Sequence, residues 1–145
     1  MAFIQREIVV HARAETVWDA LRDIGAIHTR LAPGFVTDVQ LEEGGEARVV
    51  TFGSGFSVRE LIIDVSDAAR RVAWTVVGSP LFTHHSASAQ VFPVGPHSCR
   101  FVWTADFLPH AMAPSAIATM DQFLAVMKVT LERTERENNS AHPSV

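Results

Sequence analysis

Apolar and polar positions follow two different periods along the chain, and the change between them separates helical from strand-forming parts. Residues 4–10 are rich in β-branched side chains and predict a first strand. Residues 14–23 carry apolar side chains at helical spacing and predict a helix, and residues 24–31 continue as a second short helix or turn. Pro33 and Gly34 end this helical part.

Residues 35–108 show a different pattern, in which short apolar runs alternate with turns that contain glycine, proline and serine. Strands joined by hairpins explain this pattern, and consecutive hairpins make an antiparallel meander. The last segment begins near Pro114, a residue type that suits the first turn of a helix. Its apolar face is formed by Ile117, Met120, Leu124, Met127 and Leu131. The expected fold class is therefore α+β: a curved antiparallel sheet of about seven strands around a long C-terminal helix, with two short helices after the first strand.

The lengths of two hairpin turns predict which side chains share one face of the sheet. A two-residue turn at Gly44-Gly45 puts Leu41 opposite Arg48, and a three-residue turn at residues 53–55 puts Arg48 opposite Glu60. Both turns place the same mostly apolar set on one face, which is expected to be buried: Phe35, Val39, Leu41, Arg48, Val50, Phe52, Val58, Glu60 and Ile62. Extending the register adds Val72, Trp74 and Val76 to this face.

Continuing the same register into the last two strands produces a conflict. It places His84, Ser86, Ser88 and Gln90 inside, opposite Asp106, Thr104, Val102 and Arg100, and it places Phe101 and Trp103 outside. Hydrophobicity alone predicts the reverse. Three explanations compete: a bulge between Pro80 and His85 that flips the register, a polar pocket on the inner face, or an oligomer interface on the outer face.

Composition limits the classes of protein that need to be considered. The chain has 145 residues, 48% apolar and 19% charged, which suits one domain over residues 1–137 and a polar, disordered tail over residues 138–145. A formal net charge of −4 without a basic stripe argues against nucleic acid as a partner. Charges interrupt the first apolar run and no long apolar stretch follows, so neither a signal peptide nor a membrane span is expected. Cys99 is the only cysteine, which excludes an internal disulfide and fits a cytoplasmic location.

A series of segments carries a family resemblance in its order and spacing: residues 8–18, 45–48, 58–61, 67–81 and 102–109, followed by the long final helix. Together they resemble the SRPBCC superfamily, which includes START domains, polyketide cyclases, birch-pollen-allergen-like (Bet v 1-like) proteins and plant abscisic-acid receptors, and whose fold is called helix-grip. One departure is Arg13, where family members often carry proline.

The resemblance implies an internal pocket for an apolar small molecule. No cofactor is expected. By the same resemblance the pocket residues are Arg48, Glu60, Trp74, Ser86, Ser88, Val102, Met120 and Leu124, and the predicted register adds Val50 and Thr104. Members of the superfamily bind lipids, hormones or polyketides and only some catalyse a reaction, so the fold alone does not fix the function.

Two pairs of residues are candidates for chemistry. Arg48 and Glu60, as neighbours on a buried face, are expected to form an ion pair that either orients a polar group of the ligand or fixes the strand register. If His84 faces Asp106, the carboxylate can orient the imidazole as a general base; the alternative is a partly exposed pair at a strand end. His84, Asp106 and Glu60 are therefore the candidate catalytic residues. His84 and His85 point to opposite faces of a strand and cannot bind a metal together, so no metal site is expected.

Three functions follow from these patterns. The first is binding of a lipid-, polyketide- or hormone-like molecule by a carrier or sensor. The second is a cyclase or dehydratase that acts on a polyketide, with Arg48 stabilising an enolate oxygen and His84 or Glu60 moving a proton. The third is an interaction module. The family resemblance implies that the buried face continues through Ser88 and Val102. This puts Phe101 and Trp103 on the outer face and predicts a homodimer formed through them.

Overall fold

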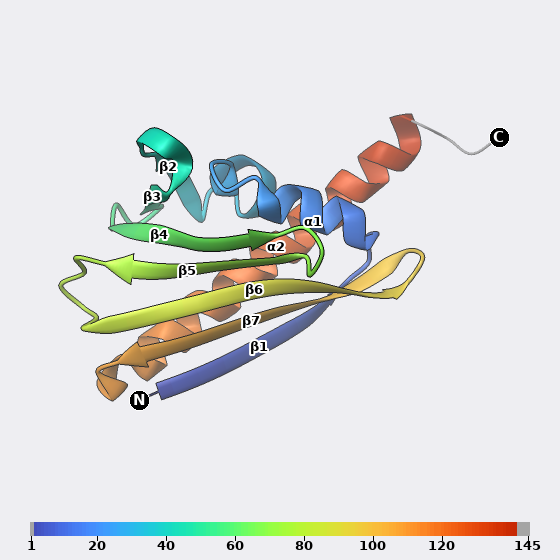
Figure 1. The fold of residues 1–145 in the computed structure, drawn as a ribbon. Coiled ribbons are helices and arrows are strands. Elements are labelled where there is room, and N and C mark those ends of the chain that lie inside the picture. Colours follow the sequence, from blue (N-terminus) through green and yellow to red (C-terminus); the bar gives the residue numbers. More distant parts are fainter. Residues whose placement is uncertain (1, 142–145) are drawn as a thin grey trace.

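A computed structural model describes residues 2–141 and shows a seven-stranded sheet with a long helix across one face (Figure 1). The elements in chain order are β1 (Ala2–Val10), α1 (Ala14–Arg22), a π-helical turn η1 (Ile27–Leu31), β2 (Val36–Leu41), a 3-10 turn η2 (Glu43–Gly45), β3 (Ala47–Phe52), β4 (Ser57–Ser66), β5 (Arg71–Val77), β6 (His84–Gly95), β7 (Ser98–Leu108), a 3-10 turn η3 (His110–Met112) and α2 (Ala113–Ala141). The expected α+β class and the two short helices after the first strand are confirmed.

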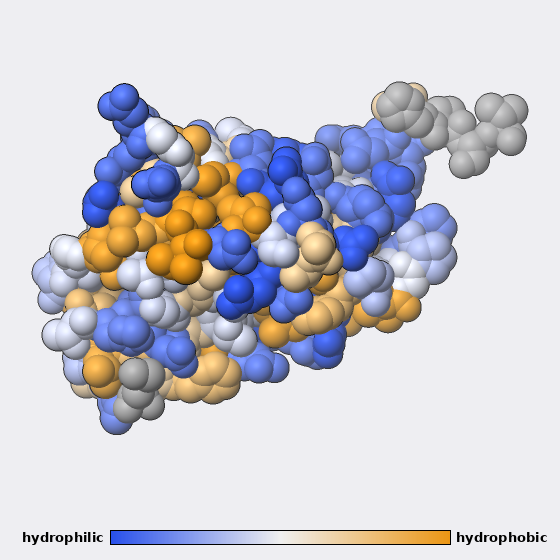
Figure 2. Space-filling model, in the orientation of Figure 1, coloured by the Kyte–Doolittle hydropathy of each residue, from blue (hydrophilic) through white to orange (hydrophobic). Residues whose placement is uncertain are grey.

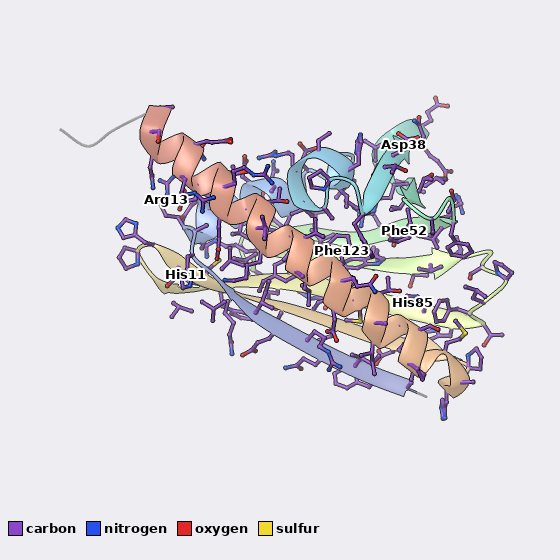
Figure 3. The ribbon with its side chains drawn as sticks, turned by 180° about the vertical axis from the view of Figure 1, so that it is seen from behind. His11, Arg13, Asp38, Phe52, His85 and Phe123 are labelled. Atoms are coloured by element: carbon purple, nitrogen blue, oxygen red, sulfur yellow. The ribbon has the colours of Figure 1, made fainter. Side chains whose placement is uncertain are left out.

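All neighbouring strands are antiparallel, in the order β1-β7-β6-β5-β4-β3-β2. The sheet curves around α2, which crosses its concave face diagonally (Figure 3). Met120, Leu124, Met127 and Leu131 of α2 are all buried against the sheet, as their helical spacing predicts, and Ile117 is partly buried. This is the helix-grip arrangement that the family resemblance implies.

The register of the first hairpins agrees with the prediction from turn lengths. Leu41 pairs with Arg48, and Arg48 pairs in turn with Glu60. Gly44 and Gly45 both adopt a positive φ in the β2–β3 turn, a conformation that favours glycine. Leu41 differs from the expectation in one respect: it is 50% exposed, because β2 is an edge strand and α2 does not cover its end.

The register of β6 and β7 corrects the extrapolated one. Trp74 on the concave face pairs with Ala87, and Ala89 of β6 pairs with Trp103. Phe101 and Trp103 therefore face α2 rather than solvent, and Phe101 is 2% exposed. The prediction of a homodimer interface through these two residues is wrong, because they do not form a patch on the outer face.

The physical reason lies in the connection between β5 and β6. This connection spans residues 78–83, an even number of residues, so even-numbered positions of β5 pair with odd-numbered positions of β6. The extrapolated register had the opposite parity and inverted both later strands. Of the three competing explanations, the flipped register is correct, although a loop and not a bulge between Pro80 and His85 produces it. The resulting register is the one that hydrophobicity alone predicts.

Glu135 ties α1 to the C-terminal half of α2. Its carboxylate accepts hydrogen bonds from the backbone N–H of Arg13 and from the Thr16 hydroxyl, the latter at 2.9 Å, and Arg13 Nε lies 3.4 Å away. Burial opposes the ionisation of Glu135, but these donors outweigh it and lower its pKa. The Arg13 N–H used here is one that a proline could not supply, which gives the departure from the usual family residue a structural role.

The end of α2 lies beyond the expected domain boundary. The helix continues to Ala141, so residues 138–141 of the predicted tail are helical. Residues 142–145 of that predicted tail lie outside the described residues. No helix of residues 2–141 is both long and apolar enough to span a membrane.

Candidate ligand-binding cavity

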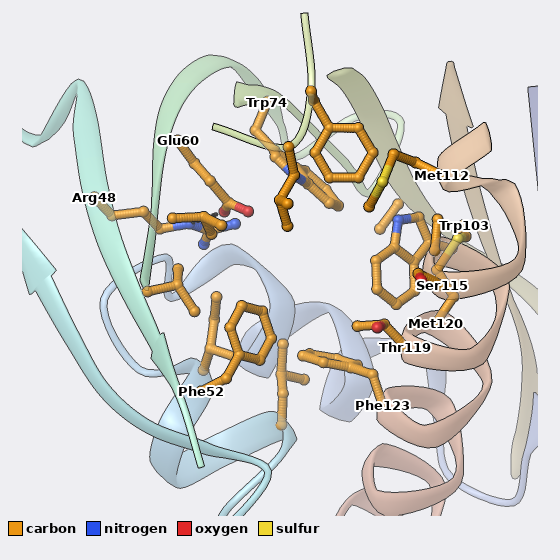
Figure 4. A pocket seen from close by; sticks show the side chains of 18 of the residues that line it. Arg48, Phe52, Glu60, Trp74, Trp103, Met112, Ser115, Thr119, Met120 and Phe123 are labelled. Atoms are coloured by element: carbon orange, nitrogen blue, oxygen red, sulfur yellow. Dashed lines mark hydrogen bonds and ion pairs between the residues drawn. The ribbon is translucent and has the colours of Figure 1, made fainter. Parts of the chain in front are cut away.

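A cavity of about 190 Å³ lies between the concave face of the sheet and the N-terminal half of α2 (Figure 4). Its lining is mostly apolar and comes from nearly every element: Leu21, Ile27, Leu31, Arg48, Val50, Phe52, Val58, Glu60, Trp74, Leu81, Phe82, Ala89, Phe101, Trp103, Met112, Ser115, Ala116, Thr119, Met120 and Phe123. Leu81, Ser115 and Thr119 are exposed although they line the cavity, so the entrance lies between the β5–β6 loop and α2.

Aromatic rings form a continuous wall along the cavity. Trp74 and Trp103 lie 6.2 Å apart between ring centroids, and Phe123 of α2 packs edge-on against Trp103 at 5.2 Å. Phe35 extends the series behind the wall, 5.9 Å from Phe123 and 5.8 Å from Phe52. Such a wall offers both ring faces and ring edges to a flat apolar molecule.

The charged groups of the lining are paired with each other. Arg48 Nε donates to Glu60 Oε1 at 2.8 Å, and Arg48 Nη1 donates to the Ile24 carbonyl oxygen at 3.0 Å. The two side chains are 5% and 11% exposed, and the guanidinium carbon lies 5.7 Å from the centroid of the Trp74 ring. The predicted ion pair is present, at the side of the cavity formed by β3 and β4.

Burial raises the pKa of Glu60 above its usual value, and the neighbouring Arg48 guanidinium opposes that rise. The pair can therefore offer a ligand hydrogen-bond donors from Arg48 and, when protonated, a donor from Glu60. Among residues 2–141, no group of three or more His, Cys, Asp or Glu side chains is arranged to hold a metal ion.

Polar atoms also occur on the opposite side of the cavity, along α2. The hydroxyls of Ser115 and Thr119 lie there, next to the indole of Trp103 (Figure 4). The Trp103 Nε1 atom is buried, and no atom of the described residues accepts a hydrogen bond from it. The cavity thus has polar groups at two separated sides and an aromatic, apolar middle.

Comparison with known families identifies the chain. The family model described as "Polyketide cyclase / dehydrase and lipid transport" matches residues 1–135, which is nearly the whole of the described structure. The chain belongs to this family. No curated protein matches the sequence.

Several solved structures have the same fold as this member of the polyketide cyclase, dehydrase and lipid-transport family. XoxI from Bacillus cereus is 18% identical with a TM-score of 0.81, over 96% of this chain and 99% of that one. A protein from Thermobifida fusca is 28% identical with a TM-score of 0.77, over 94% and 95% of the chains. The Zhui aromatase/cyclase from Streptomyces sp. R1128 is 19% identical with a TM-score of 0.75, over 99% of both chains.

Half of the predicted ligand-binding residues of this family member line the cavity. They are Arg48, Val50, Glu60, Trp74 and Met120. Leu124 belongs to the buried core behind the cavity, where it is 3% exposed. The others, Ser86, Ser88, Val102 and Thr104, lie on the convex face because of the register of β6 and β7. There the hydroxyls hydrogen-bond to convex-face neighbours: Ser88 to Thr104 at 2.9 Å and Ser86 to Thr75 at 2.7 Å.

The predicted His84–Asp106 site does not form. His84 pairs with Leu108, and Asp106 pairs with Ser86, so both candidate residues sit on the convex face away from the cavity. Their side chains make no hydrogen bond or ion pair with each other within the described part of the chain. Of the three candidate catalytic residues only Glu60 borders the cavity.

The sequence left two placements open for the aromatic residues of β7, and Phe123 of α2 was not among the predicted site residues. Phe101 and Trp103 were placed outside by an extrapolated register, although their hydrophobicity favoured the inside. Phe123 lies between the apolar positions of α2 that were assigned to the core, one residue before Leu124, and so widens the buried stripe of the helix. The apolar content of the odd-numbered positions in β6 and β7 was the signal that could have located these residues.

Proposed function

We propose that this protein binds an apolar small molecule of one or two aromatic rings in the cavity, as a carrier or sensor. The observation that carries the proposal is the cavity itself: its wall is aromatic, and the two charged side chains that line it among residues 2–141, Arg48 and Glu60, pair with each other. A cavity of 150 Å³ lined by apolar side chains is known to hold benzene. The cavity of this protein, at about 190 Å³ and open on one side, suits a molecule slightly larger than benzene.

A second function, a cyclase or dehydratase acting on a polyketide-like substrate, is supported by one specific feature. Glu60 is a carboxyl with a raised pKa beside the guanidinium of Arg48, at the edge of an apolar volume. A protonated carboxyl can transfer a proton to a substrate, and the guanidinium can stabilise an enolate oxygen. In this alternative His84 and Asp106 take no part, because both lie on the convex face away from the cavity.

Calorimetric titration with methyl naphthyl ketone tests the first function. We expect binding at a ratio of one to one, a dissociation constant on the order of tens of micromolar, and a negative heat-capacity change from burial of apolar surface. The Ala89→Phe variant adds a ring into the cavity from β6 and should weaken binding at least about tenfold, since the ring occupies the ligand's volume.

Ala73→Phe is the matched control, because it adds the same ring to the convex face of the neighbouring strand, where Ala73 pairs with Ser88. It should bind the ketone as the wild type does. If Ala89→Phe fails to fold by circular dichroism, Ala116→Leu fills the cavity from α2 instead. Equal binding by a folded cavity-filled variant and the wild type would contradict the proposal. A Glu60→Gln variant separates the two functions: a carrier keeps most of its affinity, whereas an enzyme loses turnover.

A further inference from the structure

Trp103 presents a hydrogen-bond donor that the protein itself does not use. Its ring lines the cavity, packed between Trp74 and Phe123. Its Nε1 is buried without an acceptor among the described residues. Trp18 provides a contrast within the same molecule, since its indole N–H donates to Asp67 Oδ1 at 3.0 Å.

A buried N–H without an acceptor is unfavourable, and nearly all such groups in folded proteins have a partner. No atom of residues 2–141 accepts a hydrogen bond from Trp103 Nε1, so a molecule in the cavity can supply the acceptor. A hydrocarbon in the cavity would leave the N–H without a partner, whereas a molecule with a suitably placed oxygen would satisfy it. The indole therefore distinguishes between apolar molecules of the same shape.

We propose that Trp103 is the specificity-determining donor of the cavity and binds a carbonyl oxygen of the ligand at the α2 side. This inference rests on the proposed function, because it requires a ligand in the cavity. Ser115 and Thr119 line the same side and carry further hydroxyls close to the indole (Figure 4). Arg48 and Glu60 lie on the other side, so a carbonyl bound by Trp103 also fixes which end of the ligand meets the ion pair.

Because Trp103 Nε1 is buried, this role requires the neighbouring side chains to move before a ligand oxygen can reach it. Met112 and Met120 line the cavity beside Trp103 (Figure 4). Methionine is unbranched and changes rotamer readily, so it can move aside for a ligand atom. The rings of Trp74 and Phe123 on either side of the indole hold its plane in place during this movement.

The test compares two ligands that differ only in the acceptor: methyl naphthyl ketone and isopropenylnaphthalene, in which a C=CH₂ group replaces C=O. We expect the wild type to bind the ketone about tenfold more tightly than the alkene. The Trp103→Phe variant enlarges the cavity for both ligands equally. The quantity to compare is therefore the ratio of the two dissociation constants, in which this effect cancels. This ratio should fall close to one in Trp103→Phe and stay near ten in the Trp18→Phe control.

A spectroscopic readout on the wild type keeps the test valid if Trp103→Phe does not fold. The chain has three tryptophans, hence three indole N–H signals in a ¹⁵N-labelled sample. The Trp103 signal should move downfield with the ketone and not with the alkene, while the Trp18 signal stays in place. A downfield shift of Trp74 alone, or equal affinity for ketone and alkene, would overturn the role of Trp103 and leave the proposed function standing. Failure of both ligands to bind would overturn the proposed function and this inference with it.

Discussion

Replacing the buried pair of Arg48 and Glu60 singly and together tests whether the two charges depend on each other. The structure gives the reason to expect coupling: the Nε–Oε1 distance is 2.8 Å and the side chains are 5% and 11% exposed. Removing one partner of such a pair leaves an uncompensated charge and costs about 3–5 kcal/mol, whereas replacing both by apolar residues of similar size is close to neutral. The Arg48 donor to Ile24 is lost in the double variant, which adds about 1 kcal/mol.

The variants are Arg48→Met, Glu60→Leu and their combination, each unfolded in urea at pH 7 to obtain the free energy of unfolding. Glu60→Leu should cost about 3 kcal/mol or more, because the guanidinium that it leaves behind cannot lose its proton. The double variant should cost about 1–2 kcal/mol. The resulting coupling energy should exceed about 1.5 kcal/mol. Costs of the single variants that simply add in the double variant would refute the reasoning.

The pH dependence of Arg48→Met adds an internal check on the same pair. Burial raises the pKa of Glu60 above its ordinary value of 4.5, and loss of Arg48 removes the group that opposes the rise. The folded state of this variant then holds a proton that the unfolded chain releases above pH 4.5, so its stability falls as the pH rises through that window. We expect Arg48→Met to be closest to the wild type in stability near pH 4.5 and furthest from it at pH 7.

Two further predictions concern other parts of the chain. Arg13 has a φ of −62°, which proline can adopt, so Arg13→Pro should lose only the contacts to Glu135 and should destabilise the protein by about 1 kcal/mol in urea unfolding. Arg13→Ala keeps the backbone N–H and should destabilise it less. Equal stability of the two variants would contradict this prediction. Burial lowers the pKa of His85 to about 4, with a smaller contribution from His84. The unfolded chain therefore binds a proton at this residue more readily than the folded protein does. The free energy of unfolding should fall by up to about 3 kcal/mol as the pH drops from 6.5 towards 4. His85→Phe should lack this part of the acid sensitivity in thermal unfolding, and an unchanged difference between the two proteins across that range would disprove it.

The parts of the fold that could be predicted from the sequence are those fixed by short-range geometry. The Gly44-Gly45 turn and the turn before β4 leave little freedom, so the pairing of Arg48 with Glu60 followed from counting residues. The face of α2 followed from the spacing of its apolar residues. The loop of residues 78–83 is longer, and its hydrogen-bond pattern is not encoded in turn residues alone. The register predicted between β5 and β6 by counting residues through this loop was therefore wrong by one position.

That single parity error accounts for most of the misplaced site residues. It moved His84 and Asp106 towards the cavity and Trp103 away from it, against the hydrophobicity of these residues. The link between Arg13 and Glu135 was beyond prediction for a different reason: it joins positions 122 residues apart, and only the packing of α1 on α2 brings them together.

Observing which protein atoms lie next to a bound ligand tests the central claim that the cavity is the binding site. A competing location is the convex face, which carries an apolar area over β4 and β5 (Figure 2). Ile63 of β4 is 62% exposed. The measurement is an isotope-filtered NOE spectrum of the ¹³C,¹⁵N-labelled protein with unlabelled methyl naphthyl ketone. We expect contacts from the naphthyl protons to the indoles of Trp74 and Trp103 and to the methyl group of Met120. Contacts to Ile63 and its neighbours alone, or none to the cavity residues, would contradict the account.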